Sequence, residues 1–147
     1  LEALAQYDIH SIEQPIRQHQ WQEMARLCAD SPLPIALDEE LIGVNNPTEK
    51  ALLLDTIRPQ YIILKPSLHG GMTGTREWIT IARERNIDSW ITSALESNIG
   101  LNAIAQLTAD IYGPNITTPQ GLGTGQLFTN NIPMPLKIKG DQLWISD

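Results

Sequence analysis

The stretch Tyr61-Ile-Ile-Leu-Lys65-Pro-Ser67 predicts a buried strand that ends on a lysine. Its first four residues are apolar or aromatic, a composition that favours a buried, pleated strand. Pro66 has no N–H for a strand ladder, so we expect the strand to end at Lys65. In a parallel α/β sheet, the carboxyl ends of the strands form the edge where ligands bind. Lys65 is therefore expected to present its ammonium group at that edge.

Patterns typical of strands and helices alternate along the rest of the chain. Asn46 and Pro47 suit the N-cap and the first position of a helix that ends near Ile57. Strands that alternate with helices through short loops are typical of a parallel sheet covered by helices, so we expect an α/β fold. The predicted strands cover residues 9–13, 34–39, 61–65, 87–93 and 116–118, and the predicted helices cover residues 20–29, 47–57, 73–85 and 98–111.

The predicted strands end at a regular spacing of about 27 residues. Regular βα units favour a (β/α) barrel over an open sheet, in which unit lengths vary more freely. A complete barrel of this kind needs eight strands, more than the pattern supplies. We therefore expect residues 1–130 to form part of a barrel, with the missing strands upstream of Leu1. The residues at the predicted strand ends are Glu13, Asp38, Lys65, Ser93 and Gly121.

Residues 131–147 follow a different pattern. Ile132-Pro-Met-Pro135 interrupts the repeat, and residues 136–146 alternate apolar and polar side chains around Gly140-Asp141. Alternation around a Gly-Asp turn predicts an antiparallel hairpin. We expect this tail to pack outside the barrel, on a further domain that residues 1–147 do not include.

Composition argues against several classes of function. The 147 residues include 10 basic and 17 acidic side chains, for a net charge of −7, and show no basic cluster suited to nucleic acid. No apolar run approaches the roughly 18 residues that a membrane helix needs. Cys28 is the single cysteine and cannot form an intrachain disulfide, which fits a reducing compartment. We expect a soluble, cytoplasmic protein that binds neither nucleic acid nor membrane.

Glu13 and Asp38 end consecutive predicted strands at the same edge as Lys65. Carboxylate oxygens are the ligands that Mg²⁺ prefers, so the pair could supply part of a metal site. Acids at strand ends also serve as caps or solvated loop residues, and this reading stays open. Three successive acids cannot all point inward, and alternation places Asp38 or Glu40 on one face and Glu39 on the other.

Lys65 suits three roles: acid or base, Schiff-base former, or electrostatic stabiliser. An ordinary surface lysine is the competing interpretation. His69 lies close to Lys65 in the sequence, and it shares no metal-ligand spacing with His10 or His19.

Hydroxyls and glycines follow the later strands. Thr92 and Ser93 end the fourth predicted strand just before a helix, where hydroxyls and free N–H groups suit a carboxylate or phosphate. Helix capping by Ser97 or Asn98 is an equally good interpretation of this segment. The loop from Gly121 to Gly125 could approach an anion closely, or form a plain turn.

Five motifs in chain order resemble the C-terminal part of the enolase superfamily, and most closely its o-succinylbenzoate synthases. The resemblance covers nearly the whole chain, although each motif is modest on its own. It implies a modified (β/α) TIM-like barrel with an N-terminal α+β capping domain, on which the tail would pack. The motifs are Ile12-Glu13-Gln-Pro15, Ala36-Leu-Asp38-Glu39, Ile63-Leu-Lys65-Pro66, Thr92-Ser93-Ala-Leu-Glu96-Ser97 and Gly121-Leu-Gly123-Thr.

The resemblance also implies roles for these residues. Glu13 and Asp38 match the second and third of three carboxylates that bind one Mg²⁺, and the first would precede Leu1. Lys65 matches a lysine that stabilises an enolate, opposite a Lys-x-Lys acid/base pair that would also lie upstream. Three further residues fall where members of the superfamily bind substrate carboxylates: Thr92, Ser93 and Gly121.

The implied reaction is a Mg²⁺-dependent syn dehydration of a cyclohexadiene carboxylate to o-succinylbenzoate, in menaquinone biosynthesis. The enzyme would be a carbon–oxygen lyase that includes the N-terminal half of the same protein. Because the first metal ligand and the Lys-x-Lys pair lie outside residues 1–147, we expect this chain alone to be inactive. Three alternatives stay open: a racemase or epimerase of the superfamily, a Schiff-base aldolase-type barrel that uses Lys65, and a non-enzymatic α/β binding module.

Overall fold

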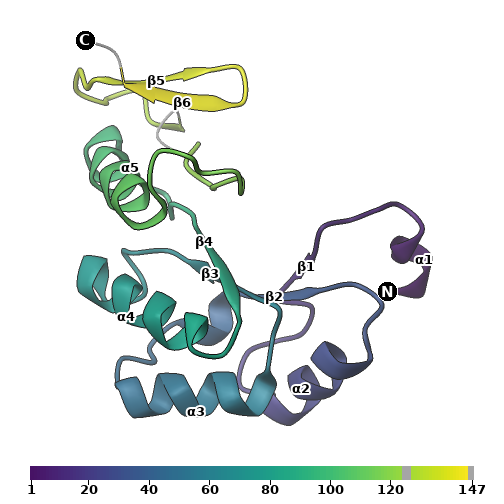
Figure 1. Ribbon diagram of the computed structural model, residues 1–147. Helices are drawn as coiled ribbons and strands as arrows, with labels where there is room; N and C mark the ends of the chain where they lie inside the picture. Colours follow the sequence, from purple (N-terminus) through teal and green to yellow (C-terminus); the bar gives the residue numbers. More distant parts are fainter. Residues whose placement is uncertain (124–126, 146–147) are drawn as a thin grey trace.

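The computed structural model describes residues 1–123 and 127–145, and its centre is a parallel sheet (Figure 1). The four strands lie in the order β1–β2–β3–β4, and every neighbouring pair is parallel. The expected α/β class with parallel βα units is therefore confirmed. The strands are β1 (Ile12–Glu13), β2 (Ile35–Leu37), β3 (Tyr61–Leu64) and β4 (Asp88–Ile91).

Helices follow the strands in alternation, and α3 packs between α2 and α4. Asn46 caps α3 because its side chain accepts the N–H of Thr48 at 2.8 Å, and Pro47 occupies the first turn, as predicted. None of the described helices is both long and apolar enough to cross a bilayer. The helices are α1 (Glu2–Ala5), α2 (Trp21–Asp30), the 3₁₀ helix η1 (Glu39–Leu41), α3 (Pro47–Ile57), α4 (Gly71–Arg83) and α5 (Asn98–Tyr112).

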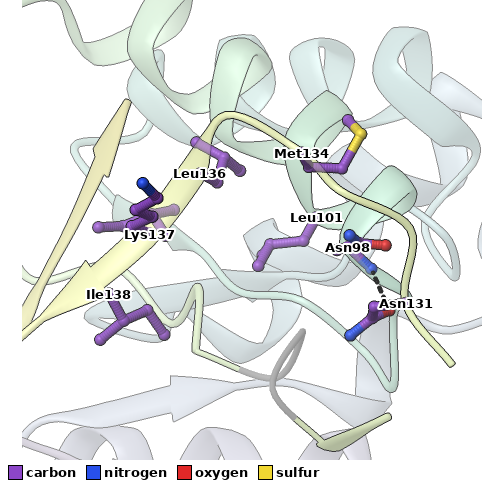
Figure 2. Close-up of a pocket in the computed structure, with 8 residues that line it drawn as sticks. Asn98, Leu101, Asn131, Met134, Leu136, Lys137 and Ile138 are labelled. Atoms are coloured by element: carbon purple, nitrogen blue, oxygen red, sulfur yellow. Dashed lines mark hydrogen bonds between the residues drawn. The ribbon is translucent and has the colours of Figure 1, made fainter. Parts of the chain in front are cut away.

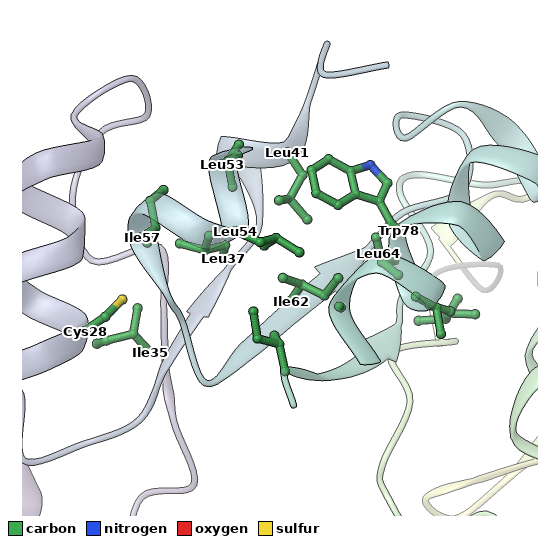
Figure 3. Close-up of a cluster of buried hydrophobic side chains, with 14 of the residues drawn as sticks. Cys28, Ile35, Leu37, Leu41, Leu53, Leu54, Ile57, Ile62, Leu64 and Trp78 are labelled. Atoms are coloured by element: carbon green, nitrogen blue, oxygen red, sulfur yellow. The ribbon is translucent and has the colours of Figure 1, made fainter. Parts of the chain in front are cut away.

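One face of the sheet forms the hydrophobic core with the helices (Figure 3). Because side chains alternate along a strand, every second residue of β2, β3 and β4 points to this face. The helices contribute fully buried side chains to it, among them Leu54 of α3 and Trp78 of α4. The strand residues in this core are Ile35, Leu37, Ile62, Leu64 and Ile91.

The opposite face of the sheet carries the other set of strand residues. Glu13 and Tyr61 both pair with Ala36, so their side chains share this face. The Tyr61 ring centroid lies 5.6 Å from that of Trp90 and 4.8 Å from that of His10. This face therefore combines an aromatic cluster with the acid that ends β1.

Two glutamine side chains bond to the backbone at the start and end of strands. Gln60 Oε1 accepts the N–H of Ile35 at 2.8 Å, and its Nε2 donates to the carbonyl of Cys28 at 3.3 Å. Gln120 Oε1 accepts the N–H of Ile91 at 2.7 Å. Uncharged side chains thus satisfy buried backbone groups that the short strands leave unpaired.

The predicted fifth strand at residues 116–118 is wrong. These residues are exposed and form no strand, since they lie between Pro114 and Pro119 and have no buried face to pack. The chain instead meets the sheet three residues later, where Gly121 forms a parallel bridge with Thr92.

The predicted antiparallel hairpin in the tail is confirmed. Strands β5 (Leu136–Lys139) and β6 (Gln142–Ile145) pair on either side of Gly140, whose φ of 64° suits a tight turn. The packing of residues 131–147 on a further domain stays a prediction.

The core predicts a difference between two neighbouring leucines of α3. Leu54 is fully buried, whereas Leu52 is 57% exposed. We expect Leu54→Ala to lower the free energy of unfolding by about 2–5 kcal/mol, because it leaves a cavity. Leu52→Ala, the matched control, should change it by less than about 0.5 kcal/mol. Urea denaturation measures both, and equal losses would contradict this account of the core.

Candidate functional site

The carboxyl ends of β2 and β3 bring Asp38 and Lys65 together. Each residue directly follows its strand, and Lys65 Nζ forms an ion pair with Asp38 Oδ2. The Asp38 side chain is fully buried, and the Lys65 side chain is 20% exposed. Removal from water strengthens the attraction between the two charges, so the ammonium group is held at the edge of the sheet.

Glu13, at the end of β1, lies beside this pair. Partial burial of its carboxyl group and the neighbouring Asp38 carboxylate raise the pKa of Glu13 from 4.5 to about 7, while Lys65 acts in the opposite direction. Both effects disfavour the charged form of Glu13. The sheet thus holds the carboxyl groups of Glu13 and Asp38 so close together that their mutual repulsion opposes ionisation of both at once.

A cation fits this arrangement. Asp38 Oδ1 is buried and receives no hydrogen bond within the described part of the chain, which is costly for a carboxylate oxygen. Hard divalent cations such as Mg²⁺ bind carboxylate oxygens of this kind. The described residues contain no cluster of three or more acid, histidine or cysteine side chains suited to a metal. Glu13 and Asp38 could therefore supply only part of such a site.

Gln14 joins the ends of β1 and β2, and the sequence pattern did not single it out. Its Oε1 accepts the backbone N–H of Asp38 at 3.1 Å and that of Glu40 at 3.3 Å. Its φ is 35°, a conformation that non-glycine residues rarely adopt. The side-chain amide therefore holds the two carboxylate-bearing segments in register, at the cost of local strain. Its place between a strand-ending acid and a proline was the only available signal.

Among the three successive acids, Asp38 alone pairs with Lys65. Glu40 is also buried, but its carboxylate accepts the N–H of His19 at 2.8 Å and bonds to Gln14 Nε2 at 3.3 Å. Glu39 is exposed. The expected separation of Glu39 from Asp38 and Glu40 is confirmed, but the predicted strand through residue 39 is not its cause, because β2 ends at Leu37 and the 3₁₀ helix η1 starts at Glu39.

Thr92, Ser93 and Gly121 are brought together at the end of β4. The Gly121 carbonyl accepts the hydroxyls of Thr92 at 2.9 Å and Ser93 at 3.1 Å, as well as the N–H of Ser93 at 2.9 Å. A Cβ atom at Gly121 would overlap the Thr92 side chain, so this close approach requires glycine. Gly125, the last glycine of the predicted loop, lies outside the described residues.

A separate pocket of about 420 Å³ opens between the start of α5 and the hairpin (Figure 2). Its wall includes Leu101, Met134 and Leu136, and the N–H of Asn98 donates to Asn131 Oδ1 at 3.0 Å. None of the six predicted site residues lines it. The pocket is therefore distinct from the acid–lysine edge.

The raised pKa of Glu13 predicts a pH-dependent stability in metal-free buffer. The Glu13 carboxyl group binds its proton more tightly in the folded chain than in the unfolded chain. Protonation of Glu13 therefore stabilises the fold, and this stabilisation is complete below pH 4.5. That effect is lost as the pH rises through about 7. Between pH 5 and pH 8, we expect Glu13→Gln to flatten the fall in the free energy of unfolding, as measured with urea and a chelator. Glu49→Gln, a matched change on the exposed start of α3, should keep the fall; parallel curves for Glu13→Gln and the unsubstituted chain would contradict the prediction.

Comparisons with known proteins find relatives that are similar to this chain in sequence and in fold. An o-succinylbenzoate synthase from Desulfotalea psychrophila is 64% identical over 146 residues, which cover 99% of this chain and 39% of that protein. The crystal structure of MenC from the same organism superposes with a TM-score of 0.90, at 64% identity, and the match covers 97% of this chain and 39% of that one. The chain thus spans about two fifths of the length of these relatives.

More distant relatives share the fold. The muconate lactonizing enzyme from Pseudomonas putida superposes with a TM-score of 0.78 at 26% identity, over 95% of this chain and 38% of that one. Residues 1–143 match the family described as enolase C-terminal domain-like. A match of that extent, together with the parallel βα units, shows that the chain belongs to the enolase C-terminal domain-like family.

Proposed function

We propose that this chain forms the C-terminal part of the barrel of an o-succinylbenzoate synthase, a lyase that dehydrates a cyclohexadiene carboxylate in menaquinone biosynthesis. The observation that carries the proposal is the set of Glu13, Asp38 and Lys65 at one sheet edge, in a chain 64% identical to such a synthase. The remaining parts of the site would come from the rest of the enzyme.

Glu13 and Asp38 are the residues that would hold Mg²⁺, together with a carboxylate from outside residues 1–147. The bound ion would neutralise negative charge on the carboxylate oxygens of the substrate. Two observations support this assignment: Asp38 Oδ1 has no hydrogen-bond partner among the described residues, and the pKa of Glu13 is raised. A nearby cation would pair with the Asp38 oxygen and would lower the pKa of Glu13.

Lys65 would act through its charge. Removal of a proton next to the substrate carboxylate places additional negative charge on the carboxylate oxygens. A preorganised ammonium group stabilises charge where it develops, and the ion pair with Asp38 preorganises that of Lys65. Proton transfer itself is assigned to groups outside this chain, so residues 1–147 alone should not turn over substrate.

Thr92, Ser93 and Gly121 are the proposed contacts to the substrate carboxylate. Both hydroxyls donate to one carbonyl, that of Gly121. Turning one hydroxyl to a carboxylate would exchange a neutral hydrogen bond for a charge-assisted one, which is the stronger kind.

A chimaera tests the proposed activity. In it, this chain replaces the matching segment of the Desulfotalea psychrophila synthase, which supplies the missing parts of the site. We expect the chimaera to form o-succinylbenzoate. Lys65→Met should lower kcat by at least about 100-fold, the usual loss on removing one preorganised electrostatic group. Lys139→Met, which removes a charge from the hairpin, should leave kcat within about twofold.

Other outcomes would reject the proposal. A folded chimaera that racemises or epimerises carboxylates without dehydration would favour another activity of the family. Borohydride reduction in the presence of substrate should leave Lys65 unmodified, and a trapped adduct there would favour Schiff-base chemistry.

A further inference from the structure

His69 is a buried titratable residue next to Lys65 that has no part in the proposed reaction. It is 1% exposed, and its Nδ1 accepts the backbone N–H of Lys65 at 2.8 Å. Its Nε2 is buried and has no hydrogen-bond partner among the described residues. Within the described part of the chain, the imidazole therefore makes one hydrogen bond, and its partner is the backbone of the lysine.

The backbone of Lys65 needs such a partner. Pro66 ends the strand ladder at this point, and a buried N–H without an acceptor is costly. On its other side, the Lys65 carbonyl accepts the N–H groups of Leu68 at 2.8 Å and His69 at 3.0 Å. In the short turn from Lys65 to His69, both the N–H and the carbonyl of Lys65 are therefore hydrogen-bonded.

The loop after His69 holds its backbone in place. Gly70 and Gly71 have φ values of 86° and 70°, which other residues rarely adopt. A Cβ atom at Gly74 would overlap the carbonyl oxygen of His69, so the first turn of α4 packs directly against this residue. The ring therefore extends toward Lys65 from a firmly packed backbone.

The charge state of the ring agrees with its role as an acceptor. Burial lowers the pKa of His69 to about 4, an effect that Asp38 opposes and the ammonium groups of Lys65 and Lys50 reinforce. The imidazole is then neutral at pH 7. Its single proton lies on Nε2, because Nδ1 accepts a hydrogen bond.

We propose that His69 is a positioning residue for Lys65: its Nδ1 fixes the lysine backbone so that the side chain reaches Asp38 at the edge of the sheet. The catalytic part of this inference rests on the proposed function, whereas the hydrogen bond does not. A bulky apolar residue would fill the same space without the acceptor and would leave the Lys65 N–H unpaired. Asparagine would keep an acceptor, because its Oδ1 lies near the position of histidine Nδ1.

The hydrogen bond is tested by NMR on the full 147-residue chain with ¹⁵N-labelled histidine. We expect Nδ1 of His69 to be unprotonated at pH 7 and Nε2 to carry the proton. His69→Leu should move the Lys65 amide proton upfield, and His69→Asn should restore most of the shift. His19→Asn is the matched control at an exposed histidine and should leave the Lys65 amide unchanged. A proton on Nδ1, or the same Lys65 amide shift in all variants, would overturn the inference.

The effect on catalysis is tested in the chimaera. Because a small displacement of a catalytic group can cost up to about 100-fold, we expect His69→Leu to lower kcat at least about tenfold while KM stays within about twofold. His69→Asn should recover kcat to within about threefold. If His69→Leu leaves kcat unchanged, or if both variants lose activity only in proportion to their folded fraction, His69 has no positioning role. An inactive but folded parent chimaera would instead reject the proposed function, and the NMR result would still decide whether the hydrogen bond exists.

Discussion

Matched parallel register is the constraint on which the candidate site depends. The strands are only two to four residues long, yet Glu13, Ala36 and Tyr61 lie in one row across the sheet. The residues that follow each strand consequently reach the same edge, where Asp38 meets Lys65. A slip of one residue in β2 would turn Asp38 toward the helices and a core residue toward the site. Helix packing on the other face prevents this, because it requires alternate residues of every strand to stay buried.

The same edge concentrates features that oppose folding. Asp38 is a fully buried carboxylate, Glu13 lies beside it, and Gln14 adopts a positive φ between them. Strain and like charges of this kind persist only where the surrounding packing determines the position of each group. The helix-covered face provides that packing with residues such as Leu54 and Trp78. Stability and chemistry are thus divided between the two faces of one sheet.

Hydrophobic pattern was enough to predict the four long helices α2 to α5, the first four strands and the meeting of strand ends, because it reports which face of each element is buried. It did not predict the short helices α1 and η1. It could not predict contacts that join distant side chains to the backbone. The Gln14 amide bonds to the start of η1, and Gly121 bridges to Thr92 instead of continuing a strand at residues 116–118. The sequence places His69 four residues after Lys65, but nothing in that spacing indicates a hydrogen bond to the lysine backbone. Such contacts depend on tertiary geometry, and the periodic spacing of apolar residues within one element carries no information about it.

Three glutamines, Gln14, Gln60 and Gln120, accept backbone N–H groups at the margins of the strands. Amides carry no net charge, so dissolved ions screen these contacts far less than they screen an exposed ion pair. The ion pair of Lys65 with Asp38 is also screened less than an exposed pair, because the Asp38 side chain is fully buried. A change in ionic strength should therefore have little effect on either the backbone contacts of the glutamines or the ion pair that they surround.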